Sequence, residues 1–159
     1  MQNGEKQQSE DMVKIISFRA GEQEFCVDIM AIKEIRGWAP PTPLPHAPAY
    51  VSGLINLRGL VIPVIDIGMR LGLPATEPSE RTAIIVTEVG TKLIGLMVEK
   101  VSDMLSISKA EIQPVPDVSD SFDRQFADGV IALQNGMVCL LSLQSIFRDL
   151  DKSDMADAA

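Results

Sequence analysis

The chain has 159 residues, a mass of 17.3 kDa and a formal net charge of −8. A chain of this length buries roughly 70% of its unfolded surface, so it needs no disulfide or metal ion to fold. The negative charge argues against a surface that wraps nucleic acid or adsorbs to anionic lipid. Aromatic residues make up only 4%, so Leu, Ile and Val must build the core, and a base-stacking platform is disfavoured.

The ends of the chain predict no targeting or membrane segment. Residues 1–12 lack the apolar stretch of a signal peptide, and no apolar run approaches the roughly 20 residues that span a bilayer. We expect disordered tails at residues 1–12 and 151–159, a folded domain over 13–150 and a cytoplasmic location. Cys26 and Cys139 lie in apolar runs, typical of buried thiols in a reducing compartment.

The first half begins with two strands, predicted at residues 13–18 and 24–29 and joined by a hairpin turn. Apolar residues recur at spacing three from Ile29 to Ile35. This spacing fits either a helical turn or the bend into a third strand. Five prolines then follow within residues 39–48 and predict an extended, rigid connection on the surface.

A short helix is predicted to begin at Pro48 and to stop at Gly53. Residues 53–65 are typical of strand, tight turn and strand. Pro63 lies in the second of these strands and indicates an edge or a bulge, because proline offers no amide to a ladder. Asp66 then caps a short helix.

Residues 73–81 form the clearest linker and mark the expected boundary between two interleaved barrel subdomains. A hairpin at 82–87 and 93–98 follows. The last hairpin is predicted over residues 129–141, with an Asn-Gly turn that tolerates positive φ angles. Ser142 can cap a final amphipathic helix.

The two halves contain an internal repeat with an offset of 76 residues. The segment from Gly53 matches that from Gly129, and the helix cap Asp66 matches Ser142. Each half supplies about five short strands with little helix, a pattern that favours an all-β fold of two small barrels packed together.

The sequence offers little catalytic chemistry. The single histidine, His46, leaves no His-dependent triad or zinc site, and there is no glycine-rich phosphate loop, so we expect neither metal nor cofactor. Asp66 follows an apolar strand, as a phosphate-accepting aspartate would, but the acidic pair that holds magnesium is missing from the first strand. Eight methionines fill the core or line an adaptable surface. These residues indicate a non-catalytic interaction module.

Several strings resemble CheW, the bacterial chemotaxis coupling protein. They lie at residues 28–37, 53–66, 95–105 and 129–131, and the string Asn-Leu-Arg-Gly with its downstream Pro and Asp is the most specific. The resemblance covers residues 13–150 and implies two SH3-like five-stranded β-barrels. It also implies an adaptor that bridges the cytoplasmic tips of methyl-accepting chemoreceptors to the regulatory domain of the CheA histidine kinase. These components form arrays at the membrane, where contacts between adaptors are also expected.

The resemblance also suggests two sets of binding residues. Those similar to the family's receptor-binding groove are Ile29, Ile32, Glu34, Arg58, Val101 and Met104. Those similar to its kinase-binding surface are Arg36, Thr42, Leu44, Gly53 and Leu57. The alternatives are that the isoleucines are ordinary core, that Arg58 is a turn residue and that the second set only supports a loop. Two other functions remain open: an adaptor of a surface-motility or biofilm array, and a phosphoryl-accepting regulator that uses Asp66.

Overall fold

The computed structural model describes residues 11–116, 124–134 and 136–148. The first strand begins at Met12, the last residue of the expected N-terminal tail. Most of that tail, the whole C-terminal tail and Asn135 of the predicted Asn-Gly turn lie outside the described residues.

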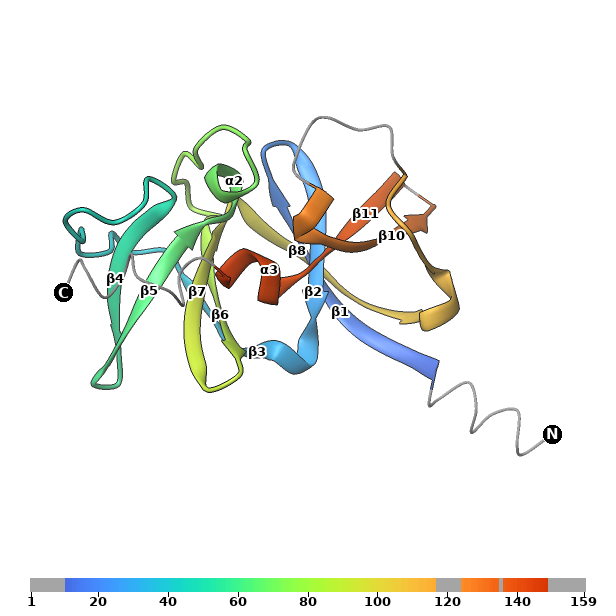
Figure 1. The fold of residues 1–159 in the computed structure, drawn as a ribbon, viewed down its shortest axis with the longest axis horizontal. Helices are drawn as coiled ribbons and strands as arrows, with labels where there is room; N and C mark the ends of the chain where they lie inside the picture. The colour runs from blue at the N-terminus through green and yellow to red at the C-terminus, as the bar shows by residue number, and fades with distance from the viewer. Residues whose placement is uncertain (1–10, 117–123, 135, 149–159) are drawn as a thin grey trace.

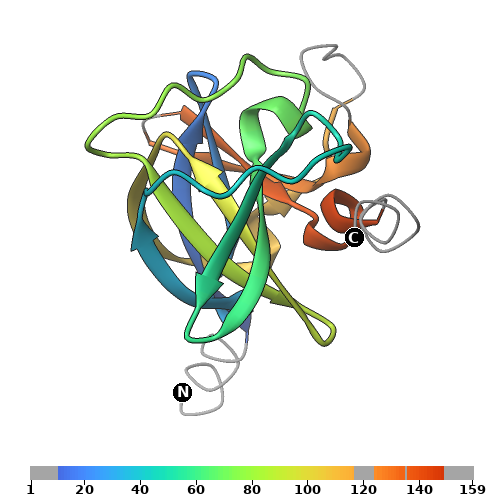
Figure 2. The ribbon, with the colours of Figure 1, turned by 90° about the vertical axis from the view of Figure 1, so that its left-hand side faces the viewer.

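The described chain forms two β-sheets that lie side by side, with a short helix between them (Figure 1). The five-stranded sheet contains, in spatial order, β3 (Ile32–Gly37), β6 (Ala83–Val89), β7 (Lys92–Val98), β5 (Leu60–Asp66) and β4 (Val51–Leu57). The six-stranded sheet contains β8 (Lys100–Ser108), β1 (Met12–Ala20), β2 (Gln23–Asp28), β11 (Gly136–Leu141), β10 (Ala127–Leu133) and β9 (Ile112–Gln113). Seen end-on, the strands of the five-stranded unit curve around a common interior (Figure 2). The predicted all-β fold of two small barrels is confirmed.

The two units exchange strands along the sequence instead of dividing it in half. The hairpin β1–β2 belongs to the sheet built by the second half, and β6–β7 belongs to the sheet built by the first. Residues 73–81 therefore connect two parts of the same sheet. Two long-range parallel pairings produce this exchange: β5 pairs with β7, and β11 pairs with β2. The alternation of apolar and polar residues within a strand does not specify which distant strand it pairs with.

The predicted repeat is confirmed in the strand order. Taken in order, β3, β6, β7, β5 and β4 correspond to β8, β1, β2, β11 and β10. A bulge between Val51 and Gly53 matches one between Ala127 and Gly129, at the predicted offset. Within the proline-rich segment, Thr42 forms an isolated bridge to Leu54 of β4, which corresponds to the pairing of β9 with β10.

Several local predictions are confirmed and one is wrong. The segment after β2 contains both elements that the spacing allowed, a 3-10 turn at η1 (Ile29–Ala31) and then β3. Pro63 lies one residue before the ladder with β7 begins, as expected for a residue without an amide donor. No helix begins at Pro48. The amide of Val51 bonds the Pro48 carbonyl in a turn, and Val51 then joins β4 opposite Ile65.

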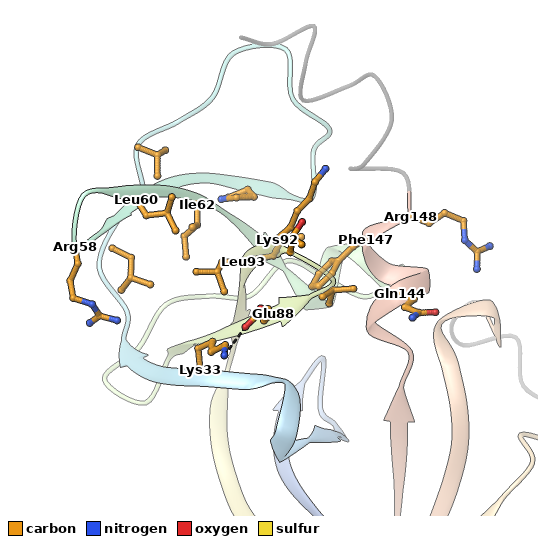
Figure 3. A pocket seen from close by; sticks show the side chains of 16 residues that line it. Lys33, Arg58, Leu60, Ile62, Glu88, Lys92, Leu93, Gln144, Phe147 and Arg148 are labelled. Atoms are coloured by element: carbon orange, nitrogen blue, oxygen red, sulfur yellow. Dashed lines mark ion pairs between the residues drawn. The ribbon is translucent and has the colours of Figure 1, made fainter.

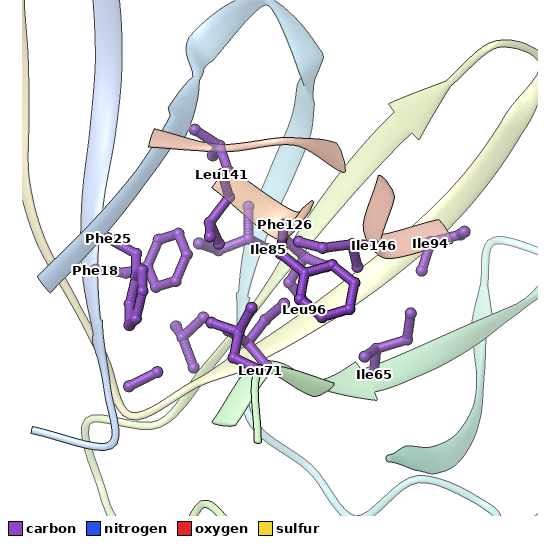
Figure 4. Close-up of a cluster of buried hydrophobic side chains, with 14 of the residues drawn as sticks. Phe18, Phe25, Ile65, Leu71, Ile85, Ile94, Leu96, Phe126, Leu141 and Ile146 are labelled. Carbon is purple, nitrogen blue, oxygen red and sulfur yellow. The ribbon is translucent and has the colours of Figure 1, made fainter. Parts of the chain in front are cut away.

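A shared core joins the two units (Figure 4). It contains Phe18 and Phe25 from one sheet and Ile85 and Leu96 from the other, all fully buried. The predicted caps place two helices beside it: Asp66 caps α2 (Ile67–Arg70) and Ser142 caps α3 (Leu143–Phe147). Other buried members are Ala20, Val27, Ile65, Ile67, Leu71, Ala83, Ile94, Val98, Phe126, Cys139, Leu141, Ile146 and Phe147. The units are therefore held as one body by apolar burial.

Arg70 links α2 to α3. Its Nε donates to the Ile146 carbonyl at 3.0 Å and its Nη2 to the Ser145 carbonyl at 3.5 Å. The guanidinium carbon lies 4.5 Å from the ring centre of Tyr50 and 4.6 Å from that of Phe126. A cation at the carboxyl end of α3 also supplies donors to the carbonyl groups there.

We expect Arg70→Met to lower the free energy of unfolding by about 2 kcal/mol. Methionine keeps the apolar stem but loses the charge-assisted hydrogen bonds and both cation–π contacts. Urea denaturation followed by circular dichroism measures the change. Arg81→Met is the matched control, because Arg81 is exposed, and it should change stability by less than about 0.5 kcal/mol. Equal midpoints for the two variants would contradict the link between the helices.

Candidate interaction surfaces

An exposed ion pair joins Arg58 to Glu34 on the surface. Arg58 lies in the tight turn between β4 and β5 with φ +51°, followed by Gly59 at φ +87°. The Asn56 Oδ1 accepts the Gly59 amide at 2.8 Å and closes the turn. The Arg58 Nη2 lies 2.7 Å from the Glu34 Oε1 on β3, and the arginine side chain is 76% exposed.

Stability alone does not account for an arginine at this turn position. A left-handed backbone costs a non-glycine residue roughly 1 kcal/mol, and Asn or Asp tolerate it better. An exposed ion pair returns about 0–1 kcal/mol. Arginine is therefore not the residue that turn stability alone favours here, and both the binding role and the turn-only alternative stay predictions.

The apolar members of the first predicted set divide into supporting and exposed residues. Ile32 and Val101 are half-buried and pack against the shared core, as the core alternative expects for Ile32. Ile29 is half-buried in η1, whereas Met104 on β8 is 60% exposed.

Two exposed apolar side chains stand outside this set: Met30, one of the methionines that the sequence offered for an adaptable surface, and Ile35, which sequence reasoning missed. Met30 is 86% exposed and Ile35 is 44% exposed. The Asp28 Oδ1 accepts the Met30 amide at 2.9 Å and caps η1, which brings Met30 to the surface. An aspartate two residues before a methionine was the available signal, since Asx capping begins a turn.

A shallow hollow of about 530 Å³ lies where the edge strands of the two sheets approach each other. It is lined by Ile35 and Arg36 of β3, by Lys100 and Val101 of β8, and by residues before β6. The hollow contains Val101 of the first predicted set and Arg36 of the second. The structure therefore does not separate the two sets cleanly along this seam.

The other members of the second set lie within the proline-rich segment or on β4, the strand that it contacts. Thr42 is exposed, and its amide and carbonyl exchange hydrogen bonds of 2.8 and 2.7 Å with Leu54. Leu44 is half-buried. Gly53 is buried, and Leu57 is only 5% exposed in the core of the five-stranded unit. These two residues support the surface from beneath.

A larger groove of about 930 Å³ lies at the tips of the β4–β5 and β6–β7 hairpins and reaches α3 (Figure 3). Leu57, Ile62, Leu93 and Phe147 form its apolar lining, and Arg58 lies on its rim. Sequence reasoning did not find this groove. It arises from the approach of α3 to two distant hairpins, which no local pattern reports.

Asp66 is a helix cap in the structure. It is 4% exposed, and its Oδ2 accepts the Thr76 amide at 2.9 Å. Its Oδ1 accepts the Thr76 hydroxyl at 2.8 Å and the Met69 amide at 3.4 Å. Within the described ranges, no group of three or more His, Cys, Asp or Glu side chains could hold a metal ion. The carboxylate is committed to the fold, which argues against the phosphoryl-accepting alternative.

The two cysteines are buried, as the sequence predicts, and lie in different clusters. Cys139 faces the shared core, and Cys26 belongs to the core of the six-stranded unit. Desolvation by burial, with a smaller effect of the nearby Cys139, raises the pKa of Cys26 to about 12. Burial, with a smaller effect of Asp128, raises the pKa of Cys139 to about 11. Both thiols stay protonated near neutral pH and are poor nucleophiles.

We expect neither thiol to react with a disulfide reagent at pH 8 until the protein unfolds. Folding raises both pKa values, so above about pH 9 the unfolded thiols lose their protons while the native thiols keep them. The thiol contribution to stability is thus constant below about pH 9 and falls by about 1.4 kcal/mol per pH unit per thiol above it. Urea denaturation between pH 8 and 10.5 measures the fall, and Cys26→Ala with Cys139→Ala should flatten it. Rapid labelling of the native protein would contradict the assignment.

Comparison with known proteins identifies the fold family. The model of a family described as CheW-like domain matches residues 14–151. The chain belongs to the CheW-like domain family. It is a chemotaxis coupling adaptor.

Individual CheW proteins and a solved CheW structure align along most of the chain. The chemotaxis protein CheW of Rhizobium meliloti (strain 1021) is 52% identical over 147 residues, covering 92% of this chain and 95% of that protein. CheW of Bacillus subtilis (strain 168) is 28% identical and covers 91% of each chain. The crystal structure of the scaffolding protein TtCheW from Thermoanaerobacter tengcongensis superposes with a TM-score of 0.80 at 31% identity, covering 85% of this chain and 87% of that one.

Among the described residues, no helix has both the length and the apolar character to cross a bilayer.

Proposed function

We propose that this CheW-like protein couples the cytoplasmic tips of methyl-accepting chemoreceptors to a CheA-type histidine kinase. It acts without catalysis, in the cytoplasm, and is recruited to receptor arrays at the membrane. The observation that carries the proposal is the exposed Arg58–Glu34 pair, held by a strained turn that stability does not explain. The family match along the folded chain supports it.

The receptor-binding surface is proposed along the seam between β3 and β8. A receptor tip is helical, and an apolar seam with a charged pair can accept a helix in a groove. Its residues are Ile29, Ile32, Glu34, Arg58, Val101 and Met104. Met104 supplies exposed apolar area, Ile32 and Val101 support the seam from the core, and the ion pair sets register more than affinity. Met30 and Ile35 extend the same exposed apolar area.

The kinase-binding surface is proposed on the proline-rich segment. Thr42 and Leu44 belong to it, and Arg36 is exposed on β3, the strand that precedes the segment in the chain. Gly53 and Leu57 are assigned to the same surface as positioning residues, because they are buried beneath it. A rigid proline-rich segment loses little conformational entropy on binding, which favours its use as a recognition element.

The test is receptor-dependent kinase stimulation, reconstituted from receptor-containing membranes, kinase and this adaptor. Met104→Arg should reduce the stimulation at least tenfold, because it places a charge in the apolar seam. Met137→Arg is the matched control: Met137 is 72% exposed on β11 and belongs to neither set, so stimulation should stay within twofold. Binding to the isolated kinase regulatory domain should survive both changes. Equal coupling by the two variants would refute the receptor assignment.

A further inference from the structure

A cluster of cations surrounds the shallow hollow between the edge strands β3 and β8. Arg36 of β3 and Arg81 of the turn before β6 are exposed, and Lys100 of β8 is half-buried. Within the described ranges, none of these three side chains takes part in an ion pair. Among the described residues that line the hollow, Glu80 is the one carboxylate. The hollow therefore carries an excess of positive charge on a chain whose net charge is −8.

Hydrogen bonds of the main chain fix the places from which Arg81 and Lys100 extend. In the turn before β6, the Ser79 Oγ accepts the Arg81 amide at 3.2 Å, and the Thr82 Oγ1 accepts the Ser79 amide at 2.8 Å. The Thr82 carbonyl accepts the Trp38 amide at 3.1 Å, which ties this turn to the end of β3. Lys100 is held in the ladder between β8 and β1. Because both cations extend from ordered backbone, little backbone entropy is lost when a partner binds them.

The shape of the hollow favours a protein partner over a small anion. Sites for small molecules are concave and bury most of the ligand surface, whereas this hollow is shallow and two of its three cations are exposed. A small anion held there would stay largely in water, where ion pairs are weak. A protein that covers the hollow excludes water from the same contacts and strengthens them.

The apolar part of the hollow is continuous with the proposed receptor-binding seam. Ile35 and Val101 line the hollow, and Val101 is also a residue of the seam. A helical receptor tip that lies on the seam therefore extends over the cations. Because the chain as a whole repels acidic groups, the hollow is a local exception that attracts them and fixes the position of the tip along the seam.

We propose that the receptor tip presents acidic side chains to Arg81 and Lys100 when it occupies the seam, so that the hollow selects receptors by charge. The inference rests on the proposed function and adds two residues that neither predicted set contains. Opposite charges accelerate the encounter, and a receptor with cations at the same place is rejected. Arg36 lies in the same hollow but belongs to the predicted kinase-binding set, so it is left unchanged in the test.

Sedimentation of the full-length adaptor with receptor-containing membranes tests the proposal. Arg81→Glu combined with Lys100→Glu should weaken receptor binding at least tenfold, while binding to the isolated kinase regulatory domain stays within twofold. Arg81→Gln with Lys100→Gln removes the charges without adding carboxylates and should weaken receptor binding at least threefold. Lys109→Glu with Arg148→Glu is the matched control. Both of these cations are exposed and lie outside the hollow, and the net charge changes equally, so receptor binding should stay within twofold.

Salt supplies an independent measurement, because it screens the charges but not the apolar seam. Raising the ionic strength from about 0.05 M to about 0.5 M should weaken receptor binding by the unaltered adaptor more steeply than by the glutamine variant. Equal salt dependence of the two proteins would overturn the proposal.

Met104→Arg distinguishes failure of this inference from failure of the proposed function. If Met104→Arg weakens receptor binding and the charge variants do not, the seam assignment stands and the role of the hollow is overturned. Loss of kinase-domain binding with receptor binding retained would also overturn it, because the hollow would then face the kinase. If the unaltered adaptor binds receptor-containing membranes no better than receptor-free membranes of the same lipids, the proposed function fails and the inference fails with it.

Discussion

Gly53→Asp is expected to unseat the proline-rich segment and to abolish kinase binding. A Cβ atom at residue 53 would lie 2.3 Å from the Thr42 carbonyl oxygen and 2.8 Å from its carbon. Both atoms belong to the backbone, so no side-chain rotation relieves the clash, and φ +148° is itself unfavourable for an L residue. The two hydrogen bonds between Thr42 and Leu54 must then break. We expect a loss of about 2–4 kcal/mol in the free energy of unfolding.

The measurement pairs urea denaturation with binding to the isolated kinase regulatory domain. Gly37→Ala is the control, because an added Cβ there meets nothing within 4 Å, and it should cost less than about 0.5 kcal/mol. Gly53→Ala separates packing from charge: it carries the same clash without a carboxylate, so it should weaken kinase binding too. Normal binding by folded Gly53→Ala would show that the segment does not depend on this close approach.

The sequence was sufficient for the parts of the fold that are determined locally. Alternating apolar residues and tight turns predict hairpins, and Asp66 and Ser142 predict the starts of α2 and α3, because a cap side chain acts within three residues of itself. The 76-residue offset between Gly53 and Gly129 predicted equivalent strands in the two halves, because each copy repeats the same local pattern of strand, turn and helix cap. In the structure both glycines lie at bulges of equivalent strands.

The arrangement of the two units could not be predicted in the same way. The parallel pairings of β5 with β7 and of β11 with β2 join distant segments, and their register is selected by the shared core. No local pattern in the linker at 73–81 reports that the strands on its two sides belong to the same sheet. Binding surfaces depend on the same long-range contacts. The pair Arg58–Glu34 was found through resemblance, and the groove beside it was found only in three dimensions.

Arg58→Asn is expected to make the protein more stable and less able to couple receptors to the kinase. Asparagine accepts the left-handed backbone at φ +51° more readily than arginine, which should add about 0.5–1 kcal/mol to the free energy of unfolding. The lost ion pair with Glu34 is exposed and offsets only part of this gain.

Receptor-dependent kinase stimulation should meanwhile fall at least tenfold, because the hairpin tip loses its charged contact. Opposite signs for stability and coupling would distinguish a residue retained for binding from one retained for folding. Glu34→Gln provides the comparison: it removes the pair but leaves Arg58 strained, so it should reduce coupling without the gain in stability. If Arg58→Asn lowers stability, the turn itself requires the arginine. Retained coupling in the same variant would remove Arg58 from the receptor-binding surface.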